Sequence, residues 1–384
     1  MLDFSKFHVS AQALLSGGDI YQSVPMDYFG PRPPEIEFDR DHLHPNLNMP
    51  VVALLFAPFS LGSLASGMVA WTVFTVGLLL ASAALLGSRF VTSRGLSSFD
   101  GWMISGLLAF LMLVHYPTFA GLALGQLGHL LLFVLCGAWL AARRGQDRLA
   151  GALLGTALAL KLLTAVFLLL LPWLGRWRLL RWYIGTFLAL TLLGAVAAGP
   201  ESYLRFLSVL QQVDWHASGW NASLMAPLSI LLGGGGAPSW LDFPGLATPV
   251  SAAIAASLYA LLVIAVRRVA DPETKLDLTI AGAVPLMLLA SPLGWLYYFP
   301  LLWITVSAVI EAVHPLHSHW TWWLFAACIM LASGLPYPFV ESRDATESLQ
   351  TMLVTSADTV ALLLALAFVL AAAWRIGAQR QAAG

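Results

Sequence analysis

Long apolar runs dominate this chain. Stretches such as "SLASGMVAWTVFTVGLLLASAALLG" and "ADTVALLLALAFVLAAAW" carry little charge. Runs of about 18 residues or more are long enough to cross roughly 30 Å of hydrocarbon as helices, which satisfy their own backbone hydrogen bonds. Composition agrees, because 59% of the residues are hydrophobic and only 10% are charged. The sequence therefore predicts an all-α polytopic membrane protein. The formal charge of −1 argues against a nucleic-acid partner.

The apolar runs predict about nine crossings and one further apolar segment that fits none of them. The crossings are expected at 64–87, 101–117, 126–142, 179–198, 247–266, 278–290, 295–312, 320–335 and 353–373.

Basic residues orient these crossings. If the crossings alternate, one side collects thirteen of the nineteen Lys and Arg residues: Arg89, Arg94, Arg143, Arg144, Arg148, Arg176, Arg178, Arg181, Arg267, Arg268, Lys275, Arg375 and Arg380. The other side has Lys6, Arg32, Arg40, Arg205 and Arg343. The positive-inside rule identifies the richer side as the cytoplasm. We expect a multi-pass protein of the cytoplasmic (inner) membrane.

The remaining apolar segment, "LAGALLGTALALKLLTAVFLLLLPWLG", has arginines at both ends and Lys161 in its middle. A single crossing would place one arginine cluster on the wrong side, whereas two half-helices that enter and return would not. In the hairpin interpretation Lys161 lies at the turn, where a charge at membrane depth needs a protein-lined or wet cavity. One ordinary crossing with a snorkelling lysine is the alternative.

The same count places residues 1–50 outside the membrane as an external segment, followed by a transmembrane domain over 51–384. External loops are expected at about 117–126, 199–246, 291–298 and 336–352. Within the first segment Phe4, Phe7, Ala11, Leu14 and Leu15 share a helical face, which predicts an amphipathic helix at the interface. Because an external start needs a preceding crossing or signal, we expect a first transmembrane helix upstream of Leu2.

Several polar residues have simple structural interpretations. Asp3 lies where a carboxylate can cap a helix, and Gln126 and His129 open a predicted helix at the outer face. Asn221-Ala222-Ser223 fits a glycosylation sequon. The cluster "HPLHSHW" at 314–320 is more typical of a solvated turn than of a metal site, and Cys136 and Cys328 sit in apolar segments, so we expect no disulfide.

In their order along the chain, "DFSKFHVSAQALLSGGDIY", "NLNMP" with "FAPF", "GQLGH", "RLAGALLGTALALK", "NAS" and "SPLGWLYYFP" resemble glycosyltransferase family 87, the membrane transferases of C-type fold. The resemblance implies a polyprenyl-phosphate-sugar donor, a glycan or glycolipid acceptor, surrounding membrane lipids, no cofactor and no obligatory metal. It also implies that the sugar, mannose or a related one, is transferred on the external face. Family members carry an aspartate in the first external segment, and the matching residue here is Asp3.

The resemblance assigns roles to eight residues. Asp3 would be the general base, whose partial desolvation is expected to raise its basicity, and Lys161 would neutralise the departing phosphate. Sugar or phosphate contacts would come from Asn48, Gln126, Asn221, Ser291, Trp295 and Tyr298.

Three positions depart from the family pattern. Lys161-Leu162 replaces a Lys-Pro pair, "NLNMP" replaces a tyrosine-proline-proline region, and Tyr297-Tyr298 stands where some members have a histidine after the tryptophan. These departures indicate that the donor or acceptor contacts differ here.

Two other classes of protein remain open. A transporter or flippase also uses half-helices and a buried lysine, but it predicts related repeats in the two halves of the chain, and none is visible. It also gives no reason for an external segment as large as 1–50. A non-catalytic assembly subunit is the third possibility.

Overall fold

The computed structural model describes residues 2–25, 42–43, 46–213, 215–233, 241, 243–313 and 349–381, and also 322, 323, 326, 327, 329 and 333. The helices are α1 (Leu2–Ser16), α2 (Pro50–Phe56), α3 (Leu64–Arg94), α4 (Ser98–Val114), α5 (Tyr116–Leu124), α6 (Gly128–Arg143), α7 (Asp147–Leu160), α8 (Val166–Leu170), α9 (Trp177–Ala198), α10 (Glu201–Gln211), α11 (Met225–Leu232), α12 (Ala247–Arg267), α13 (Pro272–Ala290), α14 (Leu302–Val313) and α17 (Leu349–Gln381). Short 3-10 helices are η2 (Ala57–Ser60), η3 (Leu162–Ala165), η4 (Leu171–Leu174), η5 (Trp215–Ala217), η6 (Pro244–Leu246) and η7 (Leu296–Leu301). Two short strands, β1 (Val24–Pro25) and β2 (His42–Leu43), pair antiparallel.

Among the described residues, five helices are long and apolar enough to cross a membrane, and the chain is a multi-pass membrane protein. They cover Leu64–Arg94, Trp177–Ala198, Ala247–Arg267, Leu296–Val313 and Ser356–Ala378. Each coincides with a predicted crossing. The predicted crossings at 101–117, 126–142 and 278–290 are helical, but no single helix there is both long and apolar enough to cross a membrane. The predicted crossing at 320–335 lies largely outside the described residues. The count of nine therefore stays a prediction.

The largest departure from the expected pattern is the bend between α4 and α5. Their axes meet at 67°, and most of the expected external turn at 117–126 is helical. Pro117 explains the break, because proline has no N–H to continue the α4 hydrogen bonds and fits the first turn of a new helix. Together the bent pair is long enough for one more span.

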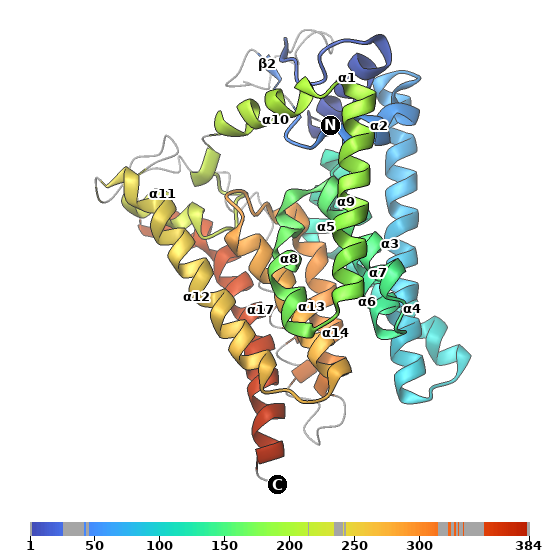
Figure 1. The fold of residues 1–384 in the computed structure, drawn as a ribbon, viewed down its shortest axis with the longest axis vertical. Helices are drawn as coiled ribbons and strands as arrows, with labels where there is room; N and C mark the ends of the chain where they lie inside the picture. Colours follow the sequence, from blue (N-terminus) through green and yellow to red (C-terminus); the bar gives the residue numbers. More distant parts are fainter. Residues whose placement is uncertain are drawn as a thin grey trace.

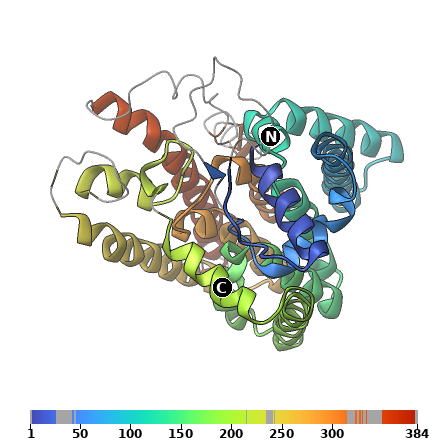
Figure 2. The same ribbon diagram turned by 90° about the horizontal axis from the view of Figure 1, so that it is seen from above.

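The core lies where α13 and α14 pack against each other and against α17. All residues of α14, and those from Leu276 to Leu289 of α13, are buried. Figure 2 shows this orange region between the red helix α17 and the helices near the N-terminal half. Residues apolar on every side of a helix are expected in such a central position, because no face meets water.

The chain reverses direction at Lys161. Backbone angles there are extended (φ −153°, ψ 117°), so α7 ends and η3, α8 and η4 follow. The two ends of this segment meet again, because Arg176 forms an ion pair with Asp147 and donates a hydrogen bond to the Ala142 carbonyl at 2.8 Å. A single straight crossing would hold these residues far apart. The arrangement therefore agrees with the hairpin interpretation.

Two glycines bring α7 and α9 together. A side chain at Gly151 would meet the Leu179 carbonyl at 2.4 Å, and one at Gly155 would meet the Tyr183 carbonyl at 2.5 Å. Both contacts advance by four residues in the same sense, so the two helices run parallel. Small residues spaced by four permit this close approach of helix backbones in membranes.

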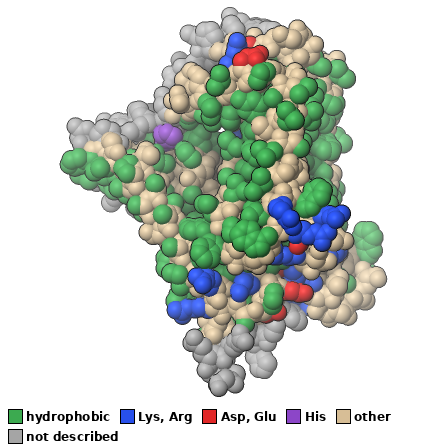
Figure 3. Space-filling view, viewed as in Figure 1, with side chains coloured by type: hydrophobic (Ala, Val, Ile, Leu, Met, Phe, Trp, Pro, Cys, Tyr) green, Lys and Arg blue, Asp and Glu red, His purple; other side chains and the backbone are tan. Residues whose placement is uncertain are grey.

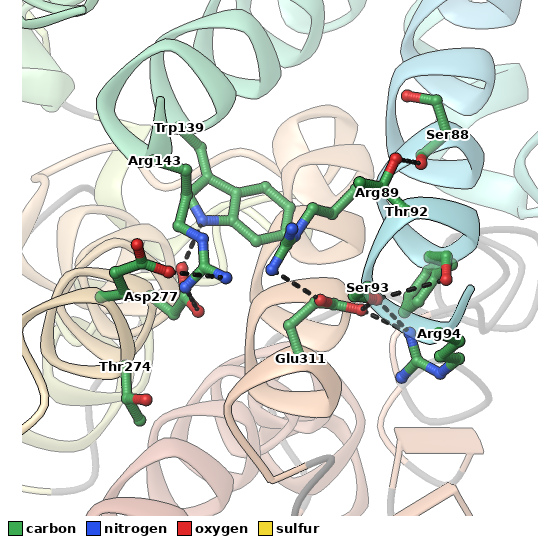
Figure 4. Close-up of polar contacts among 12 residues, drawn as sticks. Ser88, Arg89, Thr92, Ser93, Arg94, Trp139, Arg143, Thr274, Asp277 and Glu311 are labelled. Carbon is green, nitrogen blue, oxygen red and sulfur yellow. Dashed lines mark hydrogen bonds and ion pairs between the residues drawn. The ribbon is translucent and has the colours of Figure 1, made fainter. Parts of the chain in front are cut away.

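Ion pairs tie the helices together at the end of the molecule opposite the N-terminal segment (Figure 1). Glu311 of α14 is almost fully buried and binds Arg89 at 3.1 Å and Arg94 of the same helix, α3. Asp277 of α13 binds Arg143 at 2.8 Å. Figure 4 shows the two clusters side by side, with the Trp139 indole donating to Asp277. Buried carboxylates of this kind need such partners, since an unpaired buried charge is costly.

Candidate functional site

The first turn of α1 holds Asp3 against the start of α6. The Gln126 amide donates to Asp3 Oδ2 at 2.6 Å, and Lys6 Nζ lies 2.7 Å from Asp3 Oδ1. Asp3 and Lys6 are three residues apart on one helix, which brings their side chains together. Both side chains are 18% exposed. The carboxylate thus has partners on both oxygens and still reaches the surface of the protein.

Aromatic packing fixes the position of α1. The Phe4 ring lies edge-on to Phe56 at 5.9 Å between centroids, and Phe7 stacks on the same ring at 4.5 Å. A side chain at Gly125 would come within 2.6 Å of Phe4 Cβ, so glycine is needed there. Because Gly125 precedes Gln126, the packing that seats Phe4 also aligns Gln126 with Asp3.

The predicted apolar face of α1 is buried over its first turns, and burial extends beyond that face. His8, Val9 and Ser10 are buried, in addition to Phe4 and Phe7 on the predicted apolar face. The reason is that α1 packs against α2, η2, α3 and α5. Over its first three turns the helix thus packs against protein on most sides, and Asp3, Lys6 and Gln12 are only partly buried.

Lys161, at the reversal after α7, points toward the segment that precedes α2. Its Nζ donates to Asn48 Oδ1 at 2.9 Å and lies 5.7 Å from the centre of the Tyr298 ring. Asn48 is buried, and two hydrogen bonds fix its position. Its side-chain nitrogen donates to Asn46 Oδ1 at 2.7 Å, and its backbone carbonyl accepts from the Tyr21 hydroxyl at 2.7 Å. The lysine thus meets an acceptor oxygen that its neighbours orient.

Tyr298 completes this cluster from η7. Its ring is fully buried, and its hydroxyl has no hydrogen-bond partner among the described residues. The neighbouring Tyr297 ring lies at 4.9 Å and stacks on Trp295 at 5.9 Å. Trp295 therefore belongs to an aromatic row that leads to Lys161.

The environment of Asp3 lowers its pKa, contrary to our expectation from desolvation. Burial by itself raises the pKa, but the Lys6 charge and hydrogen bond, the Gln126 hydrogen bond and the Lys161 charge together hold it below its ordinary value. Burial alone would have the opposite effect, and these three groups outweigh it. Asp3 is accordingly ionised at neutral pH, and the charge of Lys161 contributes to stabilising its carboxylate.

Asn221 lies in a different setting from the six predicted site residues described so far. It is fully buried, and its amide nitrogen donates to the carbonyls of His216 and Pro292, both at 2.9 Å. Its side-chain oxygen accepts from the N–H groups of Gly294 at 2.9 Å and Ser223 at 3.1 Å. All of its usual hydrogen-bonding capacity goes to backbone, so Asn221 fixes the "SPLGW" segment.

Ser291 also makes local contacts. Its hydroxyl donates to the Leu293 carbonyl at 3.1 Å and accepts from the Leu293 N–H at 3.3 Å, which forms a turn. The structure thus brings together Asp3 with Gln126 and, linked electrostatically, Lys161 with Asn48 and Tyr298. Asn221 and Ser291 instead shape the segment that leads to Trp295 and Tyr298.

Two participants were missed from the sequence. Lys6 could have been found from its i, i+3 spacing to Asp3, whereas Asn46 had only the alternation "NLN" to mark it. The described part of the chain contains no group of three His, Cys, Asp or Glu side chains able to hold a metal ion. The histidine cluster at 314–320 and Cys328 lie outside the described residues.

Comparison with known proteins gives one match. The family model for glycosyltransferase family 87 matches residues 46–292, which include Asn48, Gln126 and Lys161. No curated protein and no solved structure matches the chain significantly. Since the matched region covers well over half of the sequence, this membrane protein belongs to glycosyltransferase family 87.

Proposed function

We propose that this glycosyltransferase moves mannose or a related sugar from a polyprenyl-phosphate donor to a glycan or glycolipid acceptor. The reaction would take place on the periplasmic or extracellular face of the cytoplasmic membrane. One observation carries the proposal: a carboxylate, Asp3, and an ammonium group, Lys161, are brought within electrostatic range from elements far apart in the sequence.

In the proposed reaction the acceptor hydroxyl oxygen forms a bond to the anomeric carbon while the bond from that carbon to the phosphate oxygen breaks. Asp3 takes the hydroxyl proton, and polyprenyl phosphate leaves. Lys161 offsets the growing negative charge on the phosphate. Because lysine keeps additional N–H donors beside its bond to Asn48, it has donors left for a ligand.

The lowered pKa of Asp3 fits this sequence of events. In the free protein Lys161 contributes to stabilising the Asp3 carboxylate. When a donor phosphate lies against Lys161, its negative charge cancels part of that stabilisation, so the pKa of Asp3 rises and the carboxylate becomes a stronger base. Donor binding would thus prepare the group that activates the acceptor.

Incubation of the purified full chain with candidate polyprenyl-phosphate sugars tests the proposal. We expect polyprenyl phosphate to be released only when an acceptor is present, together with a glycosylated acceptor. Turnover of nucleotide sugars in place of lipid-linked ones would contradict the donor assignment. Movement of the intact donor between bilayer leaflets, without transfer, would favour a flippase.

A further inference from the structure

A second candidate site lies at the arginine-rich end of the molecule. A hollow of about 340 Å³ separates the turn between α6 and α7 from the start of α9. Its lining consists of Gly145, Gln146, Asp147, Arg148, Leu149 and Arg178. None of these residues takes part in the cluster around Asp3 and Lys161.

Parallel packing of α7 and α9 creates this hollow. The close contacts of Gly151 and Gly155 hold the two helices side by side, so both begin at the same end. Arg148 in the first turn of α7 and Arg178 in the first turn of α9 therefore both line one hollow.

The charge of the hollow is positive. Its acidic residue, Asp147, is already neutralised by Arg176. Within the described part of the chain, Arg148 and Arg178 have no ion-pair partner. Arg144 and Arg181, which precede and follow the lining residues closely in sequence, are also exposed. Figure 3 shows basic side chains gathered in this region beside a broad hydrophobic surface.

Aromatic residues place the hollow at the edge of the apolar surface. Trp177 is 59% exposed and Trp182 is 45% exposed, and the Arg148 guanidinium lies 6.0 Å from the Trp182 ring centre. Beyond them α9 is apolar and mostly exposed, as expected of a helix in contact with lipid. Tryptophans at such a boundary lie at the level of the lipid headgroups.

We propose that this hollow binds the phosphate of an anionic phospholipid headgroup. Two arginines that line one hollow suit a phosphate, because a guanidinium group donates parallel N–H bonds to two phosphate oxygens. Leu149, half exposed on the wall, offers apolar contact for the glycerol and upper acyl chain. General attraction of basic loops to anionic membranes needs no such hollow. Lipid binding at this site should therefore depend on Arg148 and Arg178 and not on other exposed arginines.

Native mass spectrometry of the full chain in neutral detergent, titrated with phosphatidylglycerol or phosphatidylcholine, tests the proposal. We expect retained phosphatidylglycerol on the wild type and about tenfold or more weaker binding by Arg148→Gln/Arg178→Gln, since charge-assisted hydrogen bonds are lost. Arg267→Gln/Arg268→Gln is the matched control. It removes two exposed arginines that also lie over tryptophan rings, Trp173 and Trp374, outside the hollow, and it should bind normally.

Leu149→Glu supplies a second test that keeps both arginines. A carboxylate on the wall should repel the phosphate and weaken phosphatidylglycerol binding while gel filtration and thermal unfolding stay normal. Equal loss in the control double variant would show general electrostatics and overturn the proposal. Equal retention of phosphatidylcholine, or normal binding by Leu149→Glu, would also overturn it. So would displacement of the lipid by an equal concentration of inorganic phosphate or of short-chain polyprenyl phosphate.

Discussion

Replacement of Asp3 by Asn should abolish most sugar transfer without unfolding the protein. Asparagine has nearly the same size and keeps a side-chain oxygen that accepts the 2.6 Å hydrogen bond from Gln126. It cannot take a proton from an acceptor hydroxyl. If Asp3 is the general base, the transfer rate should fall by roughly 100- to 10,000-fold, the usual contribution of such a group.

The expected loss of folding stability is too small to unfold the protein. Asn at position 3 loses the ion pair with Lys6, in which both side chains are 18% exposed. Hydrogen bonds that involve a charged group contribute about 1.5–3 kcal/mol, a loss that leaves a protein of ordinary stability almost fully folded. A loss of activity by two or more orders of magnitude would therefore come from chemistry and not from a smaller folded population.

Lys6→Gln is the matched control, because it breaks the same ion pair and leaves the carboxylate in place. Acceptor-dependent release of polyprenyl phosphate should be measured for both variants at saturating donor and acceptor, alongside thermal unfolding by tryptophan fluorescence. Activity of Asp3→Asn within a few-fold of wild type would remove Asp3 from the mechanism. Equal losses in the two variants would assign Asp3 to structure alone.

Four further outcomes are expected. Lys161→Met should raise the donor KM by roughly 10- to 150-fold through loss of a charge-assisted hydrogen bond, with little change in the acceptor KM; an unchanged donor KM would exclude a phosphate contact. Gly155→Ala should lower the thermal midpoint, because the new methyl meets the Tyr183 carbonyl at 2.5 Å and overpacking costs about 1–3 kcal/mol, whereas Gly185→Ala, with nothing within 4 Å, should not. Asp277→Asn should destabilise by up to about 3–5 kcal/mol, since it removes the buried partner of Arg143 and leaves that arginine only the exposed Glu273, 3.3 Å away; a double-mutant cycle with Arg143→Met measures the coupling. Because the folded pKa of Asp3 is depressed, its contribution to stability is complete above its unfolded pKa of about 3.9 and is lost as the pH falls through the lower folded value; the pH profile of unfolding for Asp3→Asn, compared with wild type, checks this.

The long helices were predictable because their signal is local. A run such as Leu64–Arg94 can be recognised from its own residues, whatever it packs against. The bend at Pro117 was less visible, since proline in an apolar segment is compatible with a kinked helix as well as with a break. The burial of α1 depends on α2, α3 and α5, and no pattern within residues 2–16 could show that these elements enclose it.

The candidate site was predicted in part for similar reasons. Lys161 was identified because a lone charge in an apolar run is conspicuous. Its contact with Asn48 joins residues 113 positions apart, and only tertiary structure reveals it. Asn221 is the opposite case: its place in a family motif predicts a sugar contact, whereas in the structure its amide bonds to four backbone groups. Sequence does not distinguish these two uses of an asparagine.

The glycine contacts between α7 and α9 fix the position of Lys161 at the end of α7. Gly155 packs directly against α9, and six residues later the chain reverses at Lys161. One residue inserted between them would rotate Lys161 by about 100° and advance it by about 1.5 Å, which would carry its ammonium away from Asn48. The number of residues after Gly155, and not only their identity, therefore determines whether Lys161 meets Asn48.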